Sequence, residues 1–172
     1  MKLEVATLHP PQGLAALIKD LGSGENGVGG TAVPRGALTL DEYLLFCSET
    51  NDHSNLKSGN IPRSFFWFLD DEGVAIGIVR MWHYLNKSLK ERTGHISYYI
   101  RRDKRGKGYG REALRLALLT LRDFGKKRAL IITDLDNIAS IRIIQENGGI
   151  LESVGMGGEE RKFGRYWIEL EI

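Results

Sequence analysis

The densest group of chemically active residues lies between residues 101 and 114, which read RRDKRGKGYGREAL. Six of the first eleven residues are Lys or Arg, only Asp103 opposes them, and glycines alternate at Gly106, Gly108 and Gly110. The pattern predicts a flexible, positive turn that follows a strand and runs into a helix. Such a turn presents free backbone N–H groups at the positive end of a helix dipole. We therefore expect it to bind an anion such as phosphate or pyrophosphate.

Two familiar phosphate-binding loops do not match these letters. A Walker A loop needs Lys followed by Ser or Thr, whereas Lys107 is followed by Gly108. A dinucleotide-binding G-x-G-x-x-G loop needs a third glycine where this sequence has Arg111. A solvated basic turn, with glycines only for backbone geometry, remains an alternative for the loop by itself.

Composition narrows the class of protein. The chain has 172 residues, of which 42% are hydrophobic, so one domain with a real core is expected. The formal net charge is only +2, and no aromatic-rich basic face is evident, which argues against a nucleic-acid partner. Cys47 is the only cysteine, which excludes an intrachain disulfide and a cysteine-built zinc site. We find no signal peptide and no apolar run of membrane-spanning length, so a soluble cytoplasmic protein without a membrane partner is expected.

Periodicity and turn signals predict the elements of the first half of the chain. They are a strand over residues 2–8, a short helix over 12–22, an irregular glycine-rich loop over 22–30, a helix over 39–51, a hairpin over 64–82 and a strand over 94–101. Thr39 and Glu42 form a capping box at the start of the second helix, on which Leu40, Tyr43, Leu44 and Cys47 share one face.

The second half is patterned more regularly. Apolar residues at helical spacing follow the basic turn: Leu114, Ala117, Leu118 and Leu121. A buried strand over 129–134 comes next, and then a helix over 138–147 with Asn137 as its N-cap, Gly148 after its end, and Ile138, Ile141 and Ile144 facing inward. Closing strands are expected over 150–154 and 162–172. This alternation predicts an α/β fold with at least one parallel pair of strands.

With these elements in place, the sequence resembles the GNAT N-acetyltransferases. The run RGKGYG (105–110) matches the family's acetyl-CoA pyrophosphate loop, R-x-x-G-x-G/A, and DNIASIRIIQENGG (136–149) is similar to its last helix. The resemblance covers residues 65–170 and is greatest to a bacterial branch of unassigned substrate. It implies an acyl-CoA N-acyltransferase fold with a mixed central β-sheet flanked by helices on both faces. It further implies one domain, residues 1–172, in which residues 1–64 shape the acceptor pocket and residues 65–172 bind acetyl-CoA.

The resemblance assigns roles to individual residues. Tyr98, Tyr99 and Ile100 would pair with the pantetheine arm of acetyl-CoA through their backbone groups, and one amide would polarise the thioester carbonyl. The pyrophosphate would be bound by Arg105, Gly106, Lys107, Gly108, Tyr109, Gly110 and Arg111. Asn137 would contact the pantetheine arm, and its alternative is a plain N-cap. Many relatives carry a tyrosine in the last helix that protonates the leaving thiolate, but that position is Ile144 here.

Two histidines are candidates for the general base. His95 occupies a strand position where several relatives carry glutamate, and His83 ends another strand. The ordinary pKa of an imidazole makes either side chain suited to accepting the amine proton. The alternative for both is a histidine that only packs or forms hydrogen bonds.

The expected function is therefore transfer of an acetyl group from acetyl-CoA to a primary amine, without a metal. The acceptor could be a small-molecule amine, a protein N-terminus or a lysine, and a homodimer is compatible with the sequence. Two alternatives remain open: a non-catalytic acetyl-CoA-binding sensor, for which Ile144 leaves room, and a nucleic-acid-binding module that uses the basic loop.

Overall fold

The computed structural model describes residues 1–31, 38–54 and 56–170. Its strands are β1 Lys2–Val5, β2 Gly24–Glu25, β3 Val28–Gly29, β4 Arg63–Leu69, β5 Ala75–Trp82, β6 Ile96–Ile100, β7 Arg128–Asp134, β8 Ile150–Met156 and β9 Lys162–Glu169. Its helices are α1 Leu14–Leu21, α2 Leu40–Asn51, α3 Lys87–Arg92, α4 Tyr109–Asp123 and α5 Ile138–Glu146. Most predicted elements are confirmed. The last two residues of the expected closing strand lie outside the described residues.

A four-stranded antiparallel sheet forms the centre of the molecule, in the order β1-β4-β5-β6. The predicted hairpin is the β4–β5 pair, with Phe66 opposite Val79 and an acidic turn in which Asp70 accepts from the Val74 amide at 2.9 Å. Strand β6 pairs with β5 and ends the sheet, so its other edge carries no ladder within this sheet.

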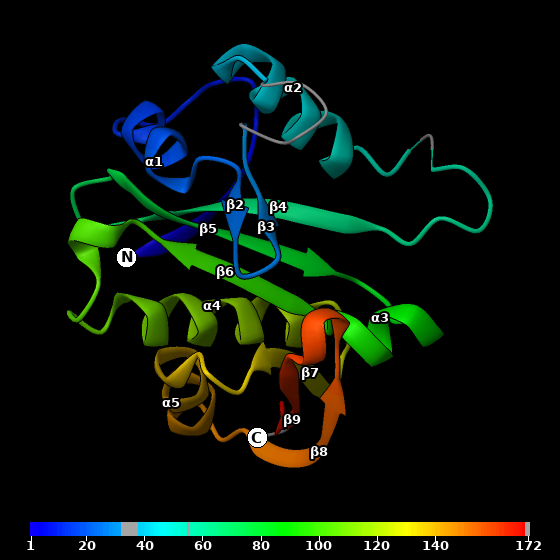
Figure 1. Ribbon diagram of the computed structural model, residues 1–172. Helices are drawn as coiled ribbons and strands as arrows, with labels where there is room; N and C mark the ends of the chain where they lie inside the picture. Colours follow the sequence, from blue (N-terminus) through cyan, green and yellow to red (C-terminus); the bar gives the residue numbers. More distant parts are fainter. Residues whose placement is uncertain (32–37, 55, 171–172) are drawn as a thin grey trace.

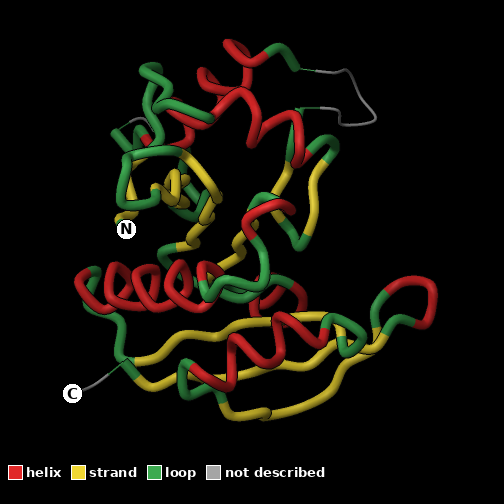
Figure 2. The backbone as a smooth tube through the Cα atoms, turned by 90° about the vertical axis from the view of Figure 1, so that its left-hand side faces the viewer, coloured by secondary structure: helices red, strands yellow, loops and turns green. Residues whose placement is uncertain are grey.

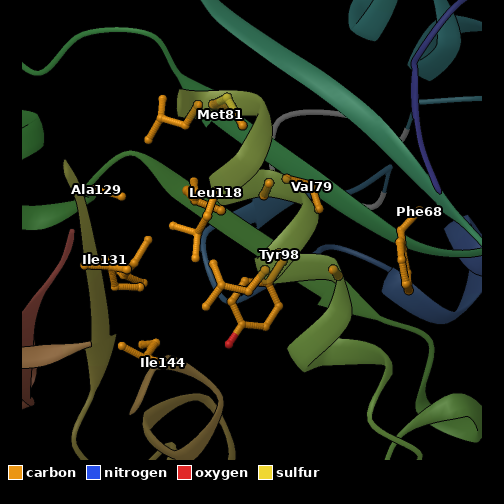
Figure 3. Close-up of a cluster of buried hydrophobic side chains, with 14 of the residues drawn as sticks. Phe68, Val79, Met81, Tyr98, Leu118, Ala129, Ile131 and Ile144 are labelled. Carbon is orange, nitrogen blue, oxygen red and sulfur yellow. The ribbon is translucent and has the colours of Figure 1, made fainter. Parts of the chain in front are cut away.

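Helices cover both faces of this sheet. Figure 1 shows α1 and α2 on one face and α4 on the other. Apolar side chains on alternate strand positions fill both interfaces because neighbouring residues of a strand point to opposite faces. On the face of α2, Trp67 and Tyr43 are almost fully buried. On the face of α4, Tyr98 and Leu118 belong to a core cluster that also contains Ile144 of α5, and Figure 3 shows this cluster.

A second, three-stranded sheet has the order β7-β9-β8. Figure 2 shows α4 lying between the two groups of strands. The expected parallel pair does not form: among the described residues every ladder is antiparallel, and β6 and β7 are connected only near their start. There, Gly94 and Ile131 form one isolated bridge, and the His95 amide donates to the Leu130 carbonyl at 2.7 Å. The two strands then diverge without pairing, which leaves the edge of β6 accessible.

Two local predictions were wrong. Residues 22–30 are not irregular throughout: they form a short antiparallel hairpin in which Glu25 pairs with Val28. Glycine lowers strand propensity, but here the turn uses positive φ at Asn26 and Gly27, which glycine-rich sequence permits. Ile138 does not face inward and is 68% exposed, because it is the first residue of α5 and precedes the part of the helix that packs. No helix in the described ranges is long and apolar enough to cross a membrane.

Candidate active site

The basic loop, residues 105–111, leads directly into helix α4, whose N-cap is Gly108. Gly106 and Gly108 have φ angles of 75° and 80°, in the left-handed region that favours glycine. A Cβ built on either residue meets nothing within 4 Å, so both border open space. Within the described part of the chain, the amides of Gly106, Lys107 and Gly108 have no hydrogen-bond partner. The loop thus presents unpaired N–H groups at the N-terminus of a 15-residue helix, where an anion is favoured.

Arg105 connects the basic loop to strand β6 and to the β2–β3 hairpin. Its Nε donates to the Ile100 carbonyl at 2.9 Å, and its Nη2 lies 3.2 Å from Glu25 Oε2. Lys107 and Arg111 are exposed and extend the positive surface around the free amides. The loop therefore combines backbone donors with several cations, as predicted from the sequence.

A groove runs between the basic loop and helix α5, and the β2–β3 hairpin crosses it. Glu25 binds Arg105 on one side of this groove. On the other side, Asn137 Nδ2 donates to Asn26 Oδ1 at 3.0 Å. The Asn137 Oδ1 also accepts from the Ser140 amide at 3.1 Å, which confirms the predicted N-cap. One side chain therefore caps α5 and holds the hairpin across the groove.

Two adjoining cavities lie along this groove. The outer cavity, about 160 Å³, is next to the basic loop, and the inner cavity, about 220 Å³, lies between the diverging strands β6 and β7. Asn26, Tyr98 and Ser140 line both cavities, so the two are neighbours along one path. The outer cavity also borders Glu25, Ile100, Arg105, Gly106, Gly110, Asn137, Ala139 and Ile143. The inner cavity also borders Gly27, Arg80, Arg92, Thr93, Ile96, Ser97, Ile131, Ile132, Thr133, Asp134, Ile144 and Phe163.

The edge of β6 facing β7 has free backbone groups. The Arg101 amide donates to the Ile76 carbonyl of β5 at 2.9 Å. Because the backbone groups of alternate residues point to opposite edges, Tyr99 also faces β5, whereas Tyr98 and Ile100 face β7. The Ile100 carbonyl is occupied by Arg105, whereas the Tyr98 backbone is free and belongs to a residue that lines the inner cavity.

The Tyr98 side chain also reaches the inner cavity. Its hydroxyl donates to Ser140 Oγ at 3.4 Å, and burial raises the pKa of Tyr98 to about 12, so the phenol is protonated at neutral pH. Ile144 lines the same cavity and is fully buried. Figure 3 shows the Tyr98 hydroxyl on the side of its ring that faces Ile144. A phenol therefore lies beside the position that the resemblance expected to be tyrosine.

Arg80 brings a positive charge to the inner cavity from the β5 strand. It lies opposite Ser97 in the sheet, and its Nη2 donates to Ser97 Oγ at 3.4 Å. Burial, together with the nearby Arg63, lowers the pKa of Arg80 to about 10. Arg80 was not among the residues predicted from the sequence, although a single arginine inside the apolar run AIGIVRMW is a signal for a functional or specially paired side chain.

His95 and His83 line neither cavity. His95 is 6% exposed, and its Nδ1 accepts from the Leu130 amide at 2.9 Å. His83 Nε2 lies 2.8 Å from Ser64 Oγ, and its ring lies 4.6 Å from the Phe124 ring. Burial lowers the pKa of each imidazole to about 4. The geometry gives both histidines packing and hydrogen-bonding roles and does not support the expected general base at either position.

Two of the predicted cofactor-binding side chains point away from the groove. Tyr99 donates its hydroxyl to Asp20 at 2.5 Å on the face that α1 and α2 cover. Tyr109 packs edge-on against Phe68, with ring centroids 6.4 Å apart. Gly110 also serves packing, because a Cβ there would lie 2.7 Å from Ile143 Cδ1 of α5.

Besides Arg80, the sequence analysis assigned no role to Asn26 or Ser140. Ser140 lies in the quoted run DNIASIR, so its signal was present in the motif. Asn26 had no signal, because its role depends on a hairpin that the glycine content concealed. Among the described residues, no group of three or more His, Cys, Asp or Glu side chains could hold a metal ion.

Comparison with known proteins identifies the family. The model of the acetyltransferase (GNAT) domain matches residues 32–150, which is more than half of the chain. The chain therefore belongs to the GNAT acetyltransferase family and is an acetyltransferase. A search of curated proteins finds no significant match.

Solved structures share the fold. A chimera of the spermidine N-acetyltransferase SpeG from Vibrio cholerae and hSSAT is 16% identical, with a TM-score of 0.67 over 98% of this chain and 95% of that chain. A GNAT-family acetyltransferase from Streptococcus pneumoniae is 16% identical, with a TM-score of 0.66 over 98% of each chain. The yncA protein of Salmonella typhimurium, whose structure holds its cofactor acetyl-CoA, is 19% identical, with a TM-score of 0.51 over 63% of this chain and 65% of that chain. These likenesses confirm the GNAT fold.

Proposed function

We propose that this protein is an acetyl-CoA-dependent N-acetyltransferase that acetylates the primary amine of a small molecule by direct transfer. The observation that carries the proposal is the continuous groove. Free amides of the basic loop lie at one end, the cavity between β6 and β7 lies at the other, and Asn26, Tyr98 and Ser140 line both parts. The yncA structure, which has the same fold, holds acetyl-CoA.

The residues along the groove fit the parts of acetyl-CoA in order. The unpaired amides of Gly106, Lys107 and Gly108 suit the pyrophosphate, with added charge from Lys107 and Arg111. The free edge of β6 suits an extended, amide-containing arm, as an added strand would. Asn137, which lines the outer cavity, is placed to contact that arm.

Acetyl transfer takes place in the inner cavity. When bound, acetyl-CoA supplies the acetyl group as a thioester, which an uncharged amine attacks directly while CoA leaves as the thiol. The Tyr98 amide donates a hydrogen bond where the carbonyl oxygen gains charge. The Tyr98 hydroxyl holds its proton at neutral pH and donates it to the leaving sulfur, a role that a tyrosine at the position of Ile144 has in many relatives. The proton that the attacking amine loses passes to the Tyr98 oxygen, directly or through water, and restores the phenol.

The acceptor amine binds on the side of the inner cavity that the β2–β3 hairpin covers. Gly27 of the hairpin turn and Arg80 and Ser97 of the sheet border the cavity there. Residues 1–64 and 65–172 would thus act as one domain, the first part closing the acceptor side and the second binding acetyl-CoA.

A thermal-shift titration and a thiol-release assay test the function. Acetyl-CoA should raise the melting temperature, and free CoA should appear when a suitable primary amine is added. Dephospho-CoA is the control for the cofactor, and an N,N-dimethylated version of the active amine is the control for the acceptor. The dimethylated amine cannot form a neutral amide.

The possible results separate the candidate functions. Stabilisation together with amine-dependent thiol release supports the proposal. Stabilisation without thiol release across a broad amine panel would favour the sensor. Absence of any response to acetyl-CoA would refute both.

A further inference from the structure

We infer that Arg80 forms a carboxylate-binding subsite in the inner cavity, so that the acceptor is a small amine that also carries a carboxylate, such as a free amino acid. The inference rests on the proposed N-acetyltransferase function and specifies its acceptor class. It depends on the hydrogen bonding of Arg80, on the space above its guanidinium and on the charges of the cavity wall.

The Arg80 guanidinium, which is part-buried, lacks the carboxylate partner that an enclosed cation normally has. Its Nε is enclosed and has no hydrogen-bond partner in the described structure. The contact of Nη2 with Ser97 Oγ, at 3.4 Å, is long and involves a neutral group. Among the described residues, no carboxylate forms an ion pair with Arg80, although several surface arginines have one.

An unpaired buried charge is unfavourable for folding. Buried arginine is normally paired with an acid because removing its hydration is costly. Here the neighbouring groups are another cation, Arg63, the Tyr43 phenol and the Trp82 ring, which lies 5.7 Å from the Arg80 guanidinium carbon. None of these groups is a carboxylate, so no negative charge in the described structure neutralises Arg80.

Space next to the guanidinium is kept free. Gly27 lies over Arg80 and Ser97 with a φ of 77°. A Cβ at Gly27 would lie 3.2 Å from Ser97 Oγ and 3.6 Å from Arg80 Nη2, so any side chain would crowd this end of the cavity. The hairpin therefore brings only backbone close to Arg80 Nη2, and the guanidinium still borders the inner cavity of about 220 Å³.

The charges of the inner cavity match an anionic acceptor. Arg80 and Arg92 both line it, and Asp134 is the one carboxylate among the described lining residues. Asp134 is exposed, whereas Arg80 lies further inside. A guanidinium offers two parallel N–H donors that match a carboxylate. A polyamine such as spermidine would meet like charge at the same place.

Matched acceptors test the inference. We would assay thiol release with L-amino acids, their carboxamides, their decarboxylated amines and spermidine. The carboxamide keeps shape and amine while removing the negative charge. We expect kcat/KM for at least one amino acid to exceed that of its carboxamide by about 10²-fold, the size expected for a hydrogen bond to a charged group. Carboxamides, decarboxylated amines or spermidine used as well as the acids would overturn the inference.

Variants locate the effect. Arg80→Met keeps most of the length and removes the charge, and it should abolish the preference for the acid while leaving the carboxamide rate within about threefold. Arg63→Met removes a neighbouring half-buried cation that does not line the inner cavity, and it should keep the preference. Equal loss for acid and carboxamide in Arg80→Met would contradict the inference.

Two readouts without turnover distinguish binding from a structural role. The N-acetylated amino acid should stabilise the wild type but not Arg80→Met, while acetyl-CoA should stabilise both. Arg80→Met should also melt at the same or a higher temperature, because it removes a part-buried charge that has no carboxylate partner. A clear decrease in melting temperature would instead indicate that Arg80 supports the fold, and Arg80→Lys would then test whether charge alone restores the preference. If the wild type neither binds acetyl-CoA nor releases thiol with any amine, the proposed function itself fails.

Discussion

The hydroxyl of Tyr98 on strand β6 donates to the hydroxyl of Ser140 on helix α5 across 3.4 Å, within the cavity that Ile144 also lines. This contact places a protonated phenol between the two diverging parts of the fold. In the proposed mechanism this phenol would supply the proton that the leaving thiolate takes up, since α5 has no tyrosine.

The first prediction tests this phenol. Tyr98→Phe should lower kcat about 10²-fold because it removes a general acid, while the Kd of acetyl-CoA changes little. Tyr99→Phe is the matched control: its hydroxyl bonds Asp20 on the opposite face, so its loss should reduce stability but not kcat. Single-turnover kinetics and a direct binding titration measure the two quantities. An unchanged kcat in Tyr98→Phe would mean that water, and not Tyr98, protonates the leaving thiolate.

The second prediction concerns the replaced tyrosine. Ile144→Tyr should not raise kcat, because Tyr98 already supplies the phenol, and it should lower stability by about 1–3 kcal/mol through overpacking. Ile144 is fully buried and lies so close to Gly149 that even a Cβ there would clash with it. Ile138→Tyr is the control, since Ile138 is exposed on the same helix. A kcat increase of tenfold or more (about 1.4 kcal/mol) would show that proton donation limits the wild type.

Local pattern was enough to predict the parts of the fold that depend on local interactions. The helical spacing from Leu114 to Leu121, the capping box at Thr39 and the N-cap at Asn137 all involve residues within one or two turns of each other. The basic loop was found for the same reason, since its glycines and cations are contiguous.

What the sequence could not predict depends on residues far apart in the chain. The hairpin at residues 22–30 is held by Glu25 and Asn26 against partners that lie 80 and 111 residues later in the chain. The absence of a parallel ladder reflects the divergence of β6 from β7, which no periodicity encodes. The catalytic expectation for His95 rested on its strand position, whereas its side chain is engaged by the Leu130 amide.

The third prediction tests the basic loop. Gly108→Asp should remove acetyl-CoA-induced stabilisation, because a carboxylate would face the pyrophosphate at the helix N-terminus. Gly125→Asp is closely matched: it follows the other end of α4, has a φ of 79° against 80° at Gly108, and has equally open surroundings. Both variants should lose similar stability through backbone strain, yet only Gly108→Asp should lose binding. Retained affinity in Gly108→Asp would place the cofactor elsewhere.

The fourth prediction follows from the burial of His95. Its folded-state pKa is lowered to about 4 from 6.5, so the unfolded chain binds this proton more tightly. The contribution of His95 to stability is therefore fully present above pH 6.5 and is lost as the pH falls toward 4. His95→Asn can still accept from the Leu130 amide but cannot titrate. Between pH 6.5 and 4 its free energy of unfolding should fall less than that of the wild type, by on the order of 2 kcal/mol, and its melting temperature should therefore fall less steeply. Its kcat at pH 8 should match that of the wild type. A large loss of kcat would restore His95 as a catalytic residue.

The last prediction concerns the charge that the hairpin places beside the basic loop. Glu25 lies 3.2 Å from Arg105, which lines the outer cavity, and 3.1 Å from Arg102. Its carboxylate therefore pairs with cations beside the groove and would repel an incoming pyrophosphate. Glu25→Gln keeps the shape and removes the charge. The Kd of acetyl-CoA should therefore fall about 3- to 10-fold at low salt, with a smaller gain at high salt because the interaction is screened. Glu49→Gln, an exposed carboxylate on α2, should leave the Kd unchanged. Weaker binding in Glu25→Gln would mean that the ion pairs help acetyl-CoA by holding the hairpin closed, and that this contribution exceeds the repulsion.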